Sequence, residues 1–143
     1  MIEFTLAPYI GSLPITFEMS PADVEKVVGP ATSIRTMASG KREERRRTFI
    51  VRYLEEDNKV VEITFLPAAI LMYQGQNLLK TDDVIGFLSK RDMPFEHVGF
   101  VIFFQLGLMV TGFHDNDDSQ KAMTVVRKGM LDRLKGRAIP LES

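Results

Sequence analysis

The most constraining feature of this sequence is an apolar run, VGFVIFFQLGLMVTGF, at residues 98–113. The run is short for a membrane span, which needs roughly 20 apolar residues, and it contains polar residues and three glycines. We therefore predict a buried β-hairpin rather than a membrane segment, with strands at Val98–Phe104 and Leu108–Phe113 and a turn at Gln105–Gly107.

This predicted hairpin is apolar on both faces. Phe100, Ile102 and Phe104 lie on one face, and Val101 and Phe103 lie on the other. A sheet covered on one side only should alternate apolar with polar residues, so the second face needs a cover too. The cover is the N-terminal segment Ile2–Leu13, a second copy of the chain or a different partner. We favour a homodimer, which makes Val101 and Phe103 contact residues, with Met109 as an adaptable contact on an exposed sheet face.

The segment MSPADVEKVVGPAT, residues 19–32, specifies a short helix. Ser20 is a typical N-cap, Pro21 suits the first helical position, and Asp23 has the spacing of a capping box. A Gly-Pro pair at residues 29–30 ends the helix. We interpret this helix as scaffold.

The remaining patterns predict further strands. Alternating apolar residues predict an antiparallel hairpin at Thr48–Leu54 and Val60–Phe65, followed by a short strand at Ile70–Tyr73. The pattern then restarts with a second helix capped by Thr81, the apolar hairpin, and a strand at Ala122–Arg127. A weak helix is predicted near the C-terminus, at Met130–Leu134.

These elements predict an α+β fold in a single domain, residues 1–143. We expect one antiparallel sheet with the helices packed on one face, because two small units would each bury too little surface alone. The order of elements predicts two similar helix-then-strands halves, at about residues 15–77 and 78–135.

Composition limits the classes of function. Lys and Arg total 18 and Asp and Glu total 19, for a net charge of −1, which does not favour nucleic-acid binding. There is no Cys, so disulfides, thiolate nucleophiles and Cys-ligated metals are excluded. Glu3 stands where a secretion signal would be basic. No phosphate loop or dinucleotide fingerprint occurs. We predict a cytoplasmic protein without a cofactor or a membrane partner.

The most charged stretch is KREERRR, residues 41–47. We interpret residues 39–47 as a solvated loop or the ends of strands, since neither neighbouring aromatics nor a glycine-rich anion loop accompanies the charges. The alternative is a docking site for an acidic partner surface, with Arg45, Arg46 and Arg47 as anchors.

The two histidines, His97 and His114, flank the apolar hairpin. They suggest a metal or acid–base site, but a catalytic zinc site needs three ligands, so we favour polar residues at the ends of a hairpin. The loop HDNDDS, residues 114–119, has alternate oxygen ligands but lacks the glycine and the glutamate of a calcium loop, because Gln120 and Val126 occupy those positions. No metal site is predicted.

The run PYIGSLPITFEMSPADVEKVVGPAT, with LGL at residues 106–108 and Lys128-Gly129 after a late strand, resembles small uncharacterised bacterial proteins with tandem helix-plus-antiparallel-strand units. Such units also resemble the β-lactamase-inhibitor-protein fold and related outer-membrane assembly lipoproteins. This chain departs from the usual opening at Glu18, where a glycine is expected, and lacks the lipoprotein Cys.

Some members of the resembled group look like immunity proteins that bind and block a toxin. The resemblance therefore implies a non-catalytic protein-binding module with a toxin or another protein as partner. Two alternatives stay open: a small-ligand-binding protein that uses the curved sheet face, and an enzyme with His97 and His114 at its site.

Overall fold

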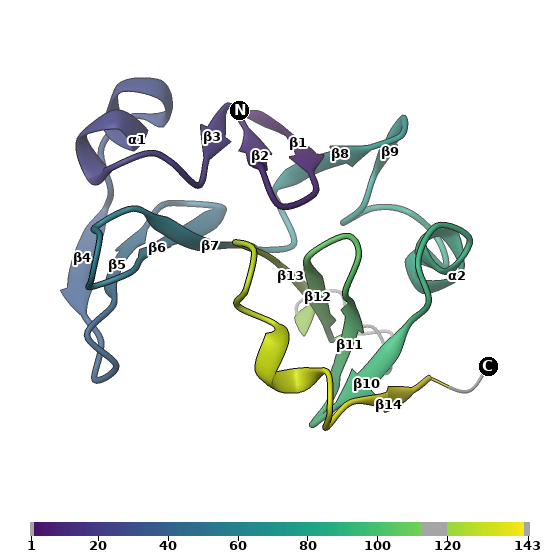
Figure 1. The fold of residues 1–143 in the computed structure, drawn as a ribbon. Helices are drawn as coiled ribbons and strands as arrows, with labels where there is room; N and C mark the ends of the chain where they lie inside the picture. The colour runs from purple at the N-terminus through teal and green to yellow at the C-terminus, as the bar shows by residue number, and fades with distance from the viewer. Residues whose placement is uncertain (1, 113–119, 142–143) are drawn as a thin grey trace.

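A computed structural model describes residues 2–112 and 120–141. The described residues form two short α-helices, and most of the other elements are short β-strands (Figure 1). The helices are α1 (Pro21–Val28) and α2 (Val84–Ser89). The strands before α2 are β1 (Glu3–Ala7), β2 (Gly11–Leu13), β3 (Ile15–Thr16), β4 (Ser33–Thr36), β5 (Arg42–Arg45), β6 (Phe49–Tyr53), β7 (Val60–Phe65), β8 (Ile70–Tyr73) and β9 (Gln76–Asn77). Those after α2 are β10 (Phe95–His97), β11 (Phe100–Phe103), β12 (Leu108–Thr111), β13 (Ala122–Val126) and β14 (Ile139–Pro140).

Most of these strands belong to one large antiparallel sheet. Within the described residues, nine strands pair in the order β14-β10-β11-β12-β13-β7-β6-β5-β4. The sequence therefore predicted an antiparallel sheet correctly, including the β6–β7 and β11–β12 hairpins. Five further strands of the described chain form a second sheet, β3-β2-β1-β8-β9, in which β1 and β8 are parallel. This smaller sheet was not predicted from the sequence.

Helix α1 forms as its sequence predicts. The Asp23 amide donates to Ser20 Oγ at 3.3 Å, and the Ser20 amide donates to Asp23 Oδ2 at 3.1 Å, which completes the capping box. Gly29 ends the helix with φ of 88°, and its amide donates to the Glu25 carbonyl. The buried side chain of Val24 joins the main core.

Helix α2 begins differently from the prediction. Asp83, rather than Thr81, caps the helix, because the Asp83 carboxylate accepts from the Gly86 amide at 3.2 Å. Thr81 instead donates its hydroxyl to the Asn77 carbonyl at 2.7 Å. The predicted terminal helix is shortened to a 3₁₀ turn at Asp132–Leu134.

The main core lies between the two sheets and includes residues of both helices. Phe4 on β1 packs against Phe49 and Phe65 of the large sheet, with ring centroids 4.8 and 5.0 Å apart. This contact fixes the small sheet on the large one and buries apolar surface of both, which is the dominant favourable term in folding.

The apolar hairpin is covered on both faces by its own chain. Val101 and Phe103 are fully buried in the main core, which also contains Phe4 and Leu6 of the N-terminal segment. Ile102, on the opposite face, is buried in a smaller cluster with Leu131 and other residues of the C-terminal segment (Figure 1). Val101 and Phe103 are therefore not contact residues, and the uncovered face from which a homodimer was predicted is filled by the chain itself. The homodimer stays a prediction without this support.

Candidate functional site

The large sheet ends at an open strand, β4, which follows α1 (Figure 1). All four residues of β4 are exposed, and Ile34 is 56% exposed although it is apolar. Among the described residues, β5 is the one strand that pairs with β4. An open edge with unpaired backbone groups is a template for another strand.

The backbone of β4 directs alternate residues outward. The Met37 amide donates to the Lys41 carbonyl next to the β4–β5 turn. Because hydrogen-bonded and non-hydrogen-bonded pairs alternate in an antiparallel ladder, Arg35 directs its amide and carbonyl toward β5. Ile34 and Thr36 then direct theirs toward the open edge. These two residues supply the backbone donors and acceptors of the edge.

A buried carboxylate lies beneath arginines on one face of this edge. The Glu43 side chain is 0% exposed and contacts Arg35, Arg45 at 3.5 Å and Arg52 at 3.4 Å. Burial opposes ionisation of Glu43, but the hydrogen bond from Arg35 and the charges of Arg52 and Arg45 outweigh it and hold the pKa of Glu43 below its usual value. Glu43 therefore carries its charge at neutral pH.

A second buried carboxylate lies on the opposite face, toward α1. Glu44 contacts Arg46 at 3.1 Å and Arg42 at 2.9 Å, and it accepts from the Tyr53 hydroxyl at 2.8 Å. The Arg46 guanidinium also donates to the Gly29 carbonyl at 2.9 and 3.1 Å, so it joins β5 to the end of α1. Burial, together with the Glu44 carboxylate, raises the pKa of Tyr53, so this hydroxyl stays protonated and donates.

The burial of both carboxylates makes the surface of this edge basic. Arg35 is 64% exposed at its side chain, and Arg42 and Arg45 are also well exposed, whereas Glu43 and Glu44 are covered. Arg47 is exposed and makes no ion pair within residues 2–112 and 120–141. We call Arg35, Arg42, Arg45 and Arg47 on or beside β4 and β5 the basic edge.

The structure separates the three predicted arginine anchors. Arg45 and Arg47 are exposed at the basic edge, but Arg46 is buried and holds Glu44 and α1 together. Residues 39–47 were predicted as a solvated loop or the ends of strands. The loop is wrong for Arg42–Arg45, which form strand β5 with both glutamates buried, because ion pairs to neighbouring strands compensate the charges.

The residues predicted to form a contact surface on the apolar hairpin do not meet at the surface. Val101 and Phe103 are buried. Met109 is partly buried and lines a pocket of about 360 Å³ with Phe100, Ile102, Leu134 and other residues. The hairpin therefore has no contact surface made of Val101, Phe103 and Met109. Met109 instead lines a pocket between the hairpin and the C-terminal segment.

The tip of the β10–β11 hairpin, beside this pocket, is strained. Val98 and Gly99 form a two-residue turn with φ of 49° and 82°, and Val98 is 81% exposed. A β-branched residue is an outlier in this left-handed conformation, where Asn or Gly is preferred. Because the Val98 side chain is so exposed, its contacts with the described residues bury little surface that could offset this strain.

Replacing Val98 with Asn is therefore expected to stabilise the protein by about 1 kcal/mol, since a left-handed conformation costs most L-residues roughly 1–2 kcal/mol and Asn less. Urea denaturation followed by circular dichroism measures the change. Val98→Ala is the control, because it shortens the side chain without favouring the turn. An Asn variant no more stable than the Ala variant would contradict the strain argument.

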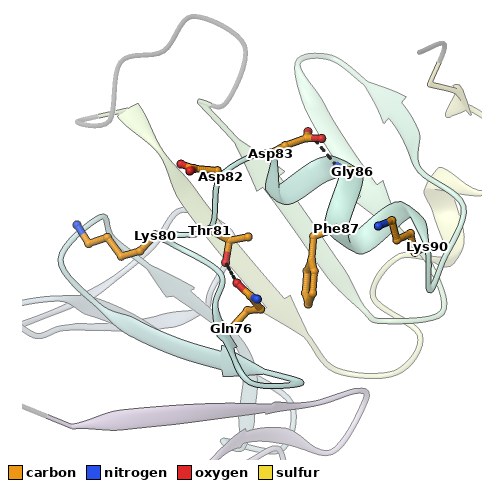
Figure 2. Close-up of a pocket in the computed structure, with 8 residues that line it drawn as sticks. All are labelled: Gln76, Lys80, Thr81, Asp82, Asp83, Gly86, Phe87 and Lys90. Carbon is orange, nitrogen blue, oxygen red and sulfur yellow. Dashed lines mark hydrogen bonds between the residues drawn. The ribbon is translucent and has the colours of Figure 1, made fainter.

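The pocket between β9 and α2, of about 560 Å³, is polar (Figure 2). It is lined by Gln76, Lys80, Thr81, Asp82, Asp83, Gly86, Phe87 and Lys90. Some of its polar groups bond to neighbours: Thr81 donates to Gln76 and to the Asn77 carbonyl, and the Asp83 carboxylate accepts from Gly86. The Phe87 ring lies 3.9 Å from the Arg91 guanidinium.

The structure tests the histidine and metal hypotheses in part. His97 ends β10, opposite Phe100, and lines the pocket beside Met109. His114 and the candidate calcium loop at residues 114–119 lie outside the described residues. In the part of the chain that the structure describes, no three His, Asp or Glu side chains form a group that could hold a metal ion.

The chain was compared with protein families, curated proteins and solved structures. No family model, no curated protein and no solved structure matches this chain. In residues 2–112 and 120–141, none of the helices has the length and apolar character needed to cross a membrane.

Proposed function

We propose that this chain is a non-catalytic protein-binding module whose partner presents an acidic surface to the basic edge. One observation carries the proposal. Exposed arginines gather on and beside the last two strands of the sheet, β4 and β5. Arg35, Arg42 and Arg45 are paired with carboxylates of Glu43 and Glu44 that are themselves buried, and Arg47 is exposed beside them. The buried carboxylates hold the guanidinium groups of Arg35, Arg42 and Arg45 in place, and their remaining donors are free to meet a partner.

Arginine suits this role because of its chemistry. A guanidinium group presents fixed donors that match a carboxylate in a bidentate manner, and it is more weakly hydrated than an ammonium group. A surface of one charge also accelerates encounters with an oppositely charged partner. The basic edge therefore favours an acidic protein partner in spite of the net charge of −1 of the whole chain.

A narrower proposal is an immunity protein in the cytoplasm that binds and blocks a toxin with an acidic surface. We also propose that residues 15–77 and 78–135 are two similar units with their helices on one face of the sheet. The order of elements supports this, because α1 precedes β4–β7 and α2 precedes β10–β13, and β7 pairs with β13.

The experiment is affinity capture from the source organism with the wild-type chain and two variants of equal charge change. Arg45→Gln with Arg47→Glu removes charge from the basic edge. Arg133→Glu with Arg137→Gln makes the same change at the pocket beside Met109, where both arginines are exposed. We expect the wild type and Arg133→Glu with Arg137→Gln (the pocket variant) to retain one acidic protein. Arg45→Gln with Arg47→Glu (the edge variant) should not retain it. Calorimetry with purified proteins should show that this acidic protein binds the wild type directly.

Equal retention by both variants would contradict the proposal. Loss with the pocket variant alone would favour the second candidate region. That region has an apolar floor at Ile102 and Leu134 with arginines at its rim, which suits a small ligand with an apolar body and a negative head. Melting temperatures of all three proteins show that each variant is folded.

A further inference from the structure

We infer that the partner contributes an extended segment of alternating acidic and apolar residues, which pairs with β4 as an additional strand of the large sheet. This inference rests on the proposed function and specifies how the partner is bound. Strand addition uses main-chain hydrogen bonds for affinity and alternate side chains for specificity.

The backbone of β4 provides the pairing surface. Ile34 and Thr36 direct their amides and carbonyls outward, and β5 occupies the other side of the strand. All residues of β4 are exposed, so an incoming strand displaces no part of the described chain. The two outward residues supply two donors and two acceptors to it.

The two faces beside β4 differ in chemistry. Arg35 lies on the face that holds Glu43, with Arg45 two pairs along the ladder. This face presents guanidinium groups to a neighbouring strand. Because side chains of a strand alternate between faces, every second residue of the incoming segment meets this basic face and is expected to be acidic.

The opposite face provides an apolar contact. Ile34 lies there beside a pocket of about 230 Å³ that Pro21, Ala22 and Ala31 help to line. Glu25, Arg42, Glu44 and Arg46 complete the lining. Arg42 and Arg46 on this face are each paired with Glu44, unlike Arg35 and Arg45, which lie on the other face with Glu43. The intervening residues of the incoming segment are therefore expected to be apolar.

The charges also select against a second copy of this chain as the occupant. Two β4 strands placed edge to edge would bring the Arg35 and Arg45 side chains of both copies together. Like charges on adjacent strands are destabilising, and charged residues on edges are a known device against self-pairing. An acidic segment in the same position would instead be attracted by the Arg35 and Arg45 side chains.

The test uses a labelled peptide of alternating Glu and Val, capped at both ends, with binding measured by fluorescence anisotropy. We expect binding that weakens as salt increases. Two peptides are controls: one with Lys in place of Glu, and one with the Glu and Val residues grouped rather than alternating. A single-stranded oligonucleotide of equal charge is the third control. Equal binding of any control would overturn the inference.

A matched pair of proline variants tests the pairing itself. Ile34→Pro removes an amide that points outward, which an edge strand tolerates, whereas Arg35→Pro removes an amide that bonds to β5. We expect Ile34→Pro to keep the wild-type melting temperature and to weaken peptide binding at least tenfold. Arg35→Pro should lower the melting temperature. Ile34→Ala retains the amide and should weaken binding less than Ile34→Pro.

The variants separate failure of this inference from failure of the proposed function. If Ile34→Pro binds the captured partner like the wild type while Arg45→Gln with Arg47→Glu does not, the basic edge binds the partner but strand addition is overturned. If neither variant weakens binding of the captured partner, the proposed function at this edge is overturned as well.

Discussion

Replacing Glu44 with Ala is expected to destabilise the protein by about 3–5 kcal/mol, the usual cost of removing one partner from a buried ion pair. Glu44 is the carboxylate partner of the buried Arg46, and the Tyr53 hydroxyl donates to it. Without Glu44, both donors stay buried and Arg46 keeps an uncompensated charge. Urea denaturation with circular dichroism measures the free energy of unfolding.

Glu44→Gln is the matched control for this prediction. It keeps the shape of the side chain and an oxygen that can accept from Tyr53, so its cost should be smaller than that of Glu44→Ala. A loss below about 1 kcal/mol for Glu44→Ala would mean that this pair behaves like an exposed ion pair. The account of a basic edge supported by buried carboxylates would then be wrong.

Replacing Phe103 with Ala is expected to cost about 3–5 kcal/mol, as in other large-to-small changes in protein cores. Phe103 is fully buried in the core that the two sheets share. Phe100→Ala is the control, because Phe100 has the same side chain in the same strand but is 37% exposed. The same denaturation experiment applies, and equal costs for the two variants would contradict the burial of the hairpin by its own chain.

The sequence predicted the elements whose signals are local. Helix α1 has its cap residues within a few positions of one another, and the runs that form β6 and β7 show apolar residues at alternate positions. The need to cover both faces of the apolar hairpin was also evident from its residues. The N-terminal segment was one of the three covers considered, and Phe4 and Leu6 of that segment share the core with Val101 and Phe103. The C-terminal cover was not predicted, because Leu131, next to a short 3₁₀ turn, belongs to no periodic pattern in the sequence.

The candidate site was harder to predict because its strands are stabilised across the sheet. Arg42–Arg45 has the composition of a solvated loop, and it becomes strand β5 only when Arg35 and Arg52 lie beside Glu43. One local signal was available: the sequence Ala-Ser-Gly at residues 38–40 is typical of a three-residue hairpin loop with glycine in the left-handed position. It would have indicated β4 and β5 together.

Amide hydrogen exchange along β4, with and without the alternating acidic peptide, tests the central claim most directly. The account predicts that the outward amides of Ile34 and Thr36 exchange more slowly in the complex. The inward amide of Arg35, which already bonds to β5, should change little. Peptide binding that leaves Ile34 and Thr36 unprotected, or protects the Val98 hairpin instead, would contradict a partner site on this edge.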